Sequence, residues 1–366
     1  MPQLWDLPAP EAGRAARPNA AGLDTAGLKA LVSALGEPAW RGGQIFEGLY
    51  RQRWPRWEQF SSLSKALRTR LEAEVDLAWP TIVQSQASED GSTKHAFELA
   101  DGKQVEGVYM PYDDRVTLCL SSQVGCAMGC TFCATGQMGI VRNLTAAEIV
   151  GQVVAMLNHH GHPEGRPVNL VFMGMGEPLH NLDHLMAAFG ILTNPKGLAI
   201  PPRRITVSTS GLVSGIEQLG AFPKRPRLAL SLNATTDAHR SAIMPANRVW
   251  NLEALAAALA AFPLQSGERI TLEYVLLKGI TDSLEDGRRL AAFAHRFPAK
   301  VNLIPFNPHE GSGFEPPDES RVGALCRLLS EAGLPVSVRR SRGQDVAGAC
   351  GQLVREGQAR KPKAED

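Results

Sequence analysis

The sequence predicts an α/β fold, a partial (βα)6 barrel of the TIM type preceded by a small helical accessory domain. Six short apolar runs follow one another after residue 114, and helical patterns separate or follow them. Strands that alternate with helices form βαβ units and a parallel sheet. Polar and Gly residues stand at the carboxyl ends of the runs, where such folds bind ligands. An open doubly wound sheet would show the same pattern, so the sequence does not separate the two.

The chain before residue 114 divides into three predicted parts. Residues 1–21 are rich in Ala and Pro and have no apolar segment, so we expect a disordered tail. Residues 22–80 carry apolar side chains at helical spacing and predict a small helical domain. Residues 81–113 alternate in character on both sides of Asp101-Gly102, which predicts a β-hairpin extension.

Two tryptophans stand beside arginines in the predicted helical domain. Trp54 and Trp57 are interleaved with Arg51, Arg53 and Arg56. Mixtures of arginine and aromatic side chains suit contacts with an RNA backbone and stacking on its bases, which predicts an RNA-binding accessory domain. The alternative is that both tryptophans pack in the core of that domain.

Residues 114–345 form the predicted core, in which the crossovers between parallel strands should be right-handed. The predicted strands are residues 116–120, 168–173, 205–208, 228–232, 270–277 and 301–306. The predicted helices are residues 145–157, 182–192, a short segment from 212, 252–262, 285–297 and 321–331. Residues 346–366 form a C-terminal segment in which Cys350 stands between two small residues, with an accessible thiol. A lone Cys is otherwise usually a small buried hydrophobic residue.

The composition limits the class of protein. The chain has 366 residues and is 44% hydrophobic, enough for a large core. It contains no run of about 18 apolar residues, so we expect no membrane span. One motif takes three of the six cysteines, which leaves too few for a disulfide framework and predicts a reducing, cytoplasmic location. The net charge is +1, so any basic surface would be local, as at the arginine clusters of residues 51–53, 202–204, 224–227 and 339–342.

Cys126, Cys130 and Cys133 lie within eight residues at Cys-x3-Cys-x2-Cys spacing. Clustered thiolates bind iron–sulfur clusters or zinc. A structural zinc ion normally takes four ligands, whereas the local count here is three. Three thiolates can hold three irons of a [4Fe–4S] cluster and leave the fourth iron open to a ligand. The alternatives are a zinc site completed by a distant Cys or His, or three inert thiols.

The ends of the predicted strands carry a second set of candidate residues. They are residues 174–178, 208–211, 231–233, 278–279 and 307–308. These stretches share one rim with the three thiols, which predicts a ligand site there. Strand ends also need turn residues for purely structural reasons.

The cysteine motif resembles a known superfamily. With Phe132 before the third Cys, it is similar to the Cys-x3-Cys-x-Phe-Cys motif of radical S-adenosylmethionine (SAM) enzymes. Further stretches resemble one subfamily, the RlmN/Cfr-type RNA adenine methyltransferases. They are residues 121–126, 142–145, 173–179, 208–211, 303–308, 342–345 and 350–353. The resemblance extends from about Leu28 to Leu353. The tail before residue 21 has no counterpart in it, and Gly348 stands where Ala is expected.

The resemblance implies a set of cofactors and ligands. One [4Fe–4S] cluster would be held by Cys126, Cys130 and Cys133, with SAM on its open iron. SAM would be contacted by Gly176, Glu177, Ser208, Ser231, Leu232, Asn233 and Asn307.

The resemblance also implies how three further residues act. C2 of adenine is electrophilic, so ordinary methyl transfer fails there, whereas a carbon radical adds to it. Cys350 would accept a methyl group from one SAM. A radical from a second SAM would then remove a hydrogen atom from that methyl group. Glu106 would remove the ring proton, and Cys119 would release the product through a transient disulfide with Cys350. Without the resemblance, Glu106 would be assigned to the polar side of a half-buried strand.

The implied substrates are an adenine in the peptidyl-transferase region of 23S rRNA and the adenine beside the anticodon of some tRNAs. An electron donor such as a flavodoxin system is also implied, and we expect a monomer. Two alternatives remain open. One is methylation of the same rRNA adenine at C8, the variant that confers antibiotic resistance. The other is a non-catalytic RNA-binding protein with a structural metal.

Overall fold

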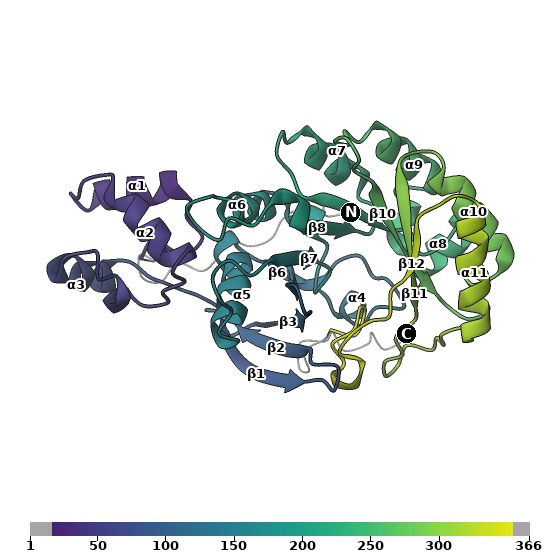
Figure 1. The fold of residues 1–366 in the computed structure, drawn as a ribbon, viewed down its shortest axis with the longest axis horizontal. Coiled ribbons are helices and arrows are strands. Elements are labelled where there is room, and N and C mark those ends of the chain that lie inside the picture. The colour runs from purple at the N-terminus through teal and green to yellow at the C-terminus, as the bar shows by residue number, and fades with distance from the viewer. Residues whose placement is uncertain (1–16, 354–366) are drawn as a thin grey trace, which may run out of the picture.

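The computed structural model describes residues 17–353 and confirms the predicted α/β core with a helical region in front of it (Figure 1). Ten strands form one mixed sheet in the order β1-β2-β3-β4-β7-β8-β9-β10-β11-β12. The first three are antiparallel, and the strands from β4 onward are parallel. Figure 1 shows the larger helices along the outside of this curved sheet.

The N-terminal region contains three helices. They are α1 (Thr25–Ala34), α2 (Arg41–Tyr50) and α3 (Lys65–Glu74). Asp24 and Ser64 begin α1 and α3 by accepting hydrogen bonds from backbone N–H groups of the first turn, as helix N-caps do. Trp57 is 4% exposed, and its indole donates to the Val75 carbonyl. Trp57 therefore packs in the core of this region, as the alternative interpretation expected.

The predicted tail is ordered at its C-terminal end. Asn19 forms a β-bridge with Asp76, and the Ala20 N–H donates to the Asp76 carbonyl at 2.9 Å. Ala20 is fully buried. Residues 17–21 thus belong to the helical region, not to a disordered tail. The sequence did not predict this, because the small side chains of Ala20 and Ala21 form no apolar pattern. Residues 1–16 lie outside the described part of the chain.

The predicted hairpin is present, but it belongs to a three-stranded extension. The strands are β1 (Thr81–Ala87), β2 (Thr93–Glu98) and β3 (Gln104–Pro111). β3 also pairs with β4, so the extension continues the core sheet. Nearly every side chain of β1 is exposed, and without a buried face the strand shows no alternation that sequence analysis could detect.

The parallel core closely follows the predicted strands. Its strands are β4 (Val116–Cys119), β7 (Val168–Phe172), β8 (Ile205–Thr209), β9 (Arg227–Ser231), β10 (Ile270–Leu276), β11 (Ala299–Pro305) and β12 (Val336–Val338). The seventh strand, β12, was not predicted because three residues give too short an apolar run. Most residues of β4, β8, β9 and β10 are buried, as expected for a sheet covered by helices.

The crossover helices also match the prediction, except that α8 was missed. They are α5 (Ala146–His159), α6 (Leu182–Leu192), α7 (Val213–Ala221), α8 (Asp237–Ile243), α9 (Leu252–Ala261), α10 (Leu284–Ala294) and α11 (Glu319–Glu331). Capping boxes begin α5 at Thr145 and α10 at Ser283. No helix within residues 17–353 is long and apolar enough to span a membrane.

The C-terminal segment crosses from the core to the sheet extension. The Gly343 N–H donates to the Asp90 carboxylate at 2.8 Å, and the Ser88 hydroxyl donates to the Asp345 carboxylate at 2.6 Å. Its last described residues return to the core, where the Ala134 N–H donates to the Gly351 carbonyl at 2.8 Å. These contacts hold the segment against the loop between β1 and β2 and against the stretch that follows Cys133.

Candidate active site

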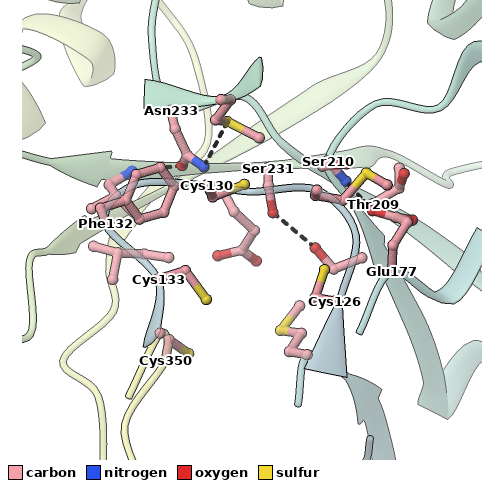
Figure 2. Close-up of a pocket in the computed structure, with 18 of the residues that line it drawn as sticks. Cys126, Cys130, Phe132, Cys133, Glu177, Thr209, Ser210, Ser231, Asn233 and Cys350 are labelled. Atoms are coloured by element: carbon pink, nitrogen blue, oxygen red, sulfur yellow. Dashed lines mark hydrogen bonds between the residues drawn. The ribbon is translucent and has the colours of Figure 1, made fainter. Parts of the chain in front are cut away.

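Cys126 ends the first of two short paired strands, and Cys130 and Cys133 lie in the loop that follows it. The elements are β5 (Gln123–Cys126), α4 (Ala134–Met138) and β6 (Gly139–Asn143). Gly125 has a φ of +76°, and a Cβ there would lie 1.9 Å from the Gly139 carbonyl oxygen. The turn into Cys126 therefore requires glycine. Figure 2 shows the side chains of Cys126, Cys130 and Cys133 around one open space.

The spacing of these sulfurs tests the two metal hypotheses. Two thiolates on one tetrahedral zinc, with bonds of about 2.3 Å, lie about 3.8 Å apart. Within residues 17–353, the sulfurs of the three motif cysteines do not all lie within 4.8 Å of one another, whereas the ligand atoms of a group of three histidines do. In a cubane cluster each thiolate binds a different iron. The donor set therefore fits an iron–sulfur cluster better than a single zinc ion.

Burial controls the protonation of all three motif thiols. It raises the pKa of Cys126 to about 12 and raises the pKa of Cys130 and of Cys133 above the ordinary value. Without metal, these side chains are neutral thiols at pH 7. Cluster binding must displace their protons, because only thiolates ligate the metal.

Cys350, from the other end of the chain, lines the same cavity as the motif cysteines. Figure 2 shows it beside Cys133, at the edge of the open space. All six cysteines are free thiols in this structure. The predicted disulfide is therefore absent from this state of the protein.

Gly176 and Glu177 form the wall of the cavity after β7. Gly176 has a φ of +105°, and a Cβ there would lie 2.6 Å from the Gln123 side chain. Glu177 is 3% exposed, and its carboxylate accepts hydrogen bonds from the N–H groups of Ser210 at 2.7 Å and Leu179 at 3.1 Å. Burial raises the pKa of Glu177, while these hydrogen bonds oppose the rise.

Most of the other predicted ligand residues line the same cavity. Ser208 and Ser231 have hydroxyls 3.1 Å apart, at the ends of neighbouring strands. Asn233 also lines it, and its side-chain oxygen accepts from the Val275 N–H at 3.0 Å. Leu232 is not among the lining residues, because its side chain is fully buried in the core.

Asn307 holds the segment that presents Cys350. It is 2% exposed at the end of β11, and its amide donates to the Cys350 carbonyl at 3.1 Å and to the Ser341 hydroxyl at 3.0 Å. Its oxygen accepts from Gln344 at 3.0 Å. The side chain thus links the end of β11 to the C-terminal segment.

Replacing Asn307 with Ala should lower the activity that depends on Cys350 at least about tenfold while the bound iron is retained, because hydrogen bonds worth roughly 1 kcal/mol each are lost from the Cys350 segment. Activity and iron content would be measured on the same preparations. Asn169→Ala is a matched control, since Asn169 lies near the amino end of β7, does not line the cavity and accepts a hydrogen bond from Arg204. Full activity of Asn307→Ala would argue against a positioning role.

Sequence analysis missed two arginines of the site. Arg240 is fully buried and donates to the carbonyls of Leu232 and Ser210, at the ends of two strands. Burial lowers its pKa to about 10. Arg339 lines the cavity, and the charge that a Cys350 thiolate would carry raises the pKa of Arg339. Arg339 stood in one of the arginine clusters of the sequence and Arg240 looked like an ordinary surface charge, so neither was predicted to belong to this site.

Cys119 lies beside the main cavity, whereas Glu106 lines neither that cavity nor the adjoining one. Cys119 shares a small adjoining cavity with Cys350 and Arg339, and burial raises its pKa to about 12. Glu106 is 2% exposed on β3 and forms an ion pair with Lys94 at 3.4 Å. Glu106 is not among the residues that line the main cavity.

Known proteins match both parts of the chain. Residues 120–291 match the radical SAM superfamily, and residues 18–77 match the N-terminal domain of ribosomal RNA large subunit methyltransferases. The dual-specificity RNA methyltransferase RlmN 2 of Myxococcus xanthus is 45% identical over 365 residues, which cover 98% of this chain and 96% of that protein. The chain belongs to the RlmN family.

Further relatives support this assignment. RlmN of Geotalea uraniireducens is 47% identical, over 89% of this chain and 93% of that protein. A radical SAM methyltransferase from Sphaerobacter thermophilus superimposes with a TM-score of 0.88 and 41% identity, over 92% of this chain and 99% of the other. The predicted fold and the resemblance to RlmN proteins are therefore confirmed.

Proposed function

We propose that this RlmN-family chain methylates C2 of adenine in RNA, with Cys350 as the methyl carrier and two SAM molecules used per turnover. The observation that carries the proposal is the position of Cys350, which lines the cavity of the three motif cysteines. The relatives from Myxococcus and Geotalea bear the name dual-specificity RNA methyltransferase. C2 methylation of 23S rRNA and tRNA agrees with that name.

Cys126, Cys130 and Cys133 would hold a [4Fe–4S] cluster, which together with SAM supplies a radical able to remove a hydrogen atom from a methyl group. The walls of the cavity suit SAM itself. Glu177 offers a carboxylate to the ligand's ammonium group, and Gly176 lets the backbone approach closely. Six of the seven predicted SAM residues line the cavity, and Leu232 would contribute through its backbone.

Cys350 must be a nucleophile before it can carry a methyl group, and thiolates are the nucleophilic form. The Arg339 guanidinium lines both cavities that Cys350 lines. A fixed cation therefore lies close to the Cys350 sulfur. Asn307 then holds the Cys350 backbone, so that the sulfur faces the motif cysteines.

Glu106 would take the proton from the adenine ring. An ionised carboxylate is the form that accepts a proton, and Glu106 pairs with Lys94. The Lys94 ammonium also contacts the Ala347 carbonyl at 3.5 Å, which links this base to the segment that carries Cys350. The RNA attached to Cys350 and the base would therefore meet at one place.

Cys119→Ala should allow the reaction to start but leave RNA covalently attached to Cys350, because no second thiol can release it. A denaturing gel with labelled RNA would show the attached species, and product should fall at least about 100-fold. Cys326→Ala is the control, since Cys326 is half-buried on α11. A Cys119→Ala variant that turns over without attached RNA would contradict the role.

RNA would contact the basic surface between the helical region and the core. Arg51, Arg53, Arg166 and Arg204 line one cavity there, with a volume of about 440 Å³. Arginines at such a place can bind phosphates, and the target adenine must leave its stack to reach the buried site. Arg225, from another predicted cluster, is instead buried in an ion pair with Glu268 at 2.9 Å.

The proposal is tested by anaerobic reconstitution with iron, sulfide, SAM, a reducing system such as flavodoxin, and either 23S rRNA fragments or tRNA. Mass spectrometry of the nucleosides should find 2-methyladenosine. Only 8-methyladenosine would establish the alternative regiochemistry. An absence of SAM cleavage after reduction would favour an RNA-binding protein with a structural metal. The proposal also includes a cytoplasmic location and a monomeric state for this protein. Gel filtration tests the oligomeric state.

A further inference from the structure

Three histidines converge outside the cavity that the motif cysteines line. His95 lies on β2, while His159 is the last residue of α5 and His160 follows it. Their nearest ring nitrogens all lie within 4.8 Å of one another. His95 is buried, His160 is half-buried and His159 is exposed, so the group can be reached from solvent on one side.

The rings are arranged as three blades of a propeller. The centroid of His95 lies 4.9 Å from that of His159 and 5.1 Å from that of His160, and the third distance is 5.0 Å. The planes meet at 72°, 69° and 70°. A tetrahedral metal with imidazole bonds of about 2.0–2.1 Å holds ring centroids about 5.2 Å apart. The three observed distances are nearly equal and close to that value.

The nitrogens need only a small adjustment to bind one ion. Nε2 of His95 and Nε2 of His160 are 2.9 Å apart, whereas two nitrogens on a tetrahedral metal lie about 3.3 Å apart. Without an ion, one of these nitrogens donates to the other. With an ion, both would present lone pairs, and separation by a few tenths of an ångström would suffice.

The surroundings orient two of the rings. Nδ1 of His95 lies 2.8 Å from the Ser85 hydroxyl. A proton on Nδ1, donated to that hydroxyl, leaves the Nε2 lone pair free, which is how ligating histidines are usually fixed. The ring of His160 stacks on Tyr109 with centroids 3.7 Å apart and an angle of 11°. Both rings are therefore held in place before any ion binds.

We propose that His95, His159 and His160 form a second metal site, which binds one zinc-class divalent ion with three imidazoles and leaves a fourth position to solvent. Imidazole suits zinc, copper and nickel. The site joins the end of α5 to β2. In the sheet, His95 is paired with Gly107, next to Glu106. An ion here would therefore connect the β2–β3 strand pair, which carries Glu106, to α5.

The test measures zinc binding by the full chain after its iron–sulfur cluster has been loaded. Competition with a chromogenic chelator should show one equivalent of zinc. His159→Ala should raise the dissociation constant at least about 100-fold, and His95→Ala should do the same. His184→Ala is the matched control, because His184 is exposed on α6, and it should leave zinc affinity unchanged. His159 is exposed, so its loss should leave the fold intact.

A second measurement separates this site from the cysteines. In the full chain with Cys126, Cys130 and Cys133 replaced by Ala, Co²⁺ should give a visible ligand-field spectrum without thiolate charge transfer. His159→Ala should abolish that spectrum. The proposal is overturned if zinc affinity is the same in His159→Ala and His184→Ala, or if the chain without motif cysteines binds neither ion.

Discussion

Cys350→Ala should abolish methylation of RNA, with a loss of at least about 1,000-fold, because no atom remains to carry the methyl group. The substitution removes one half-buried sulfur, so the fold and the cluster site should survive. Transfer of labelled methyl groups from SAM to rRNA fragments measures the loss. Iron content should match that of the unchanged chain.

The matched control is Cys326→Ala, which removes a half-buried thiol on α11, away from both cavities. It should retain full activity. SAM cleavage should continue in Cys350→Ala, since the motif cysteines are untouched, but it should no longer be coupled to product. Methylation by Cys350→Ala at a rate near that of the control would refute the carrier role.

Cys130→Ala should lose the iron–sulfur cluster and, with it, all SAM cleavage. Cys130 lies between the other two motif cysteines and faces the same cavity. Two thiolates cannot replace the three that the proposed cluster requires. Iron and sulfide analysis after anaerobic reconstitution should give background values, and the absorbance of the cluster should be absent.

Cys119→Ala is the control for this second experiment, because Cys119 lies in the adjoining cavity and is no proposed ligand. It should take up iron like the unchanged chain. Since cluster binding displaces protons from buried thiols, iron uptake should also weaken as the pH falls. A Cys130→Ala chain that held a full cluster and cleaved SAM would contradict the proposed ligand set.

Much of the architecture could be predicted because the core strands are buried on both faces. Such strands read as short, nearly continuous apolar runs, and β7 or β10 could be located from the sequence alone. The rim of ligand residues followed from the same pattern, since parallel strands bring their carboxyl ends to one edge. The roles assigned to individual residues required the resemblance to RlmN proteins.

Other features depend on tertiary contacts that leave no local pattern. β1 exposes almost every side chain, and β12 has three residues, so neither gives a periodic signal. Arg240 and Arg339 look like solvated charges until the fold places them beside strand ends. The histidine group joins residues from β2 and α5, and their separation in sequence conceals it.

The most direct test of the account is mass spectrometry of the peptide that contains Cys350, after anaerobic incubation of the loaded enzyme with methyl-labelled SAM. The account predicts a labelled methyl group on the Cys350 sulfur before RNA is added, and the same label in adenosine afterwards. An enzyme that methylates RNA at full rate while Cys350 stays an unmodified thiol throughout would contradict it.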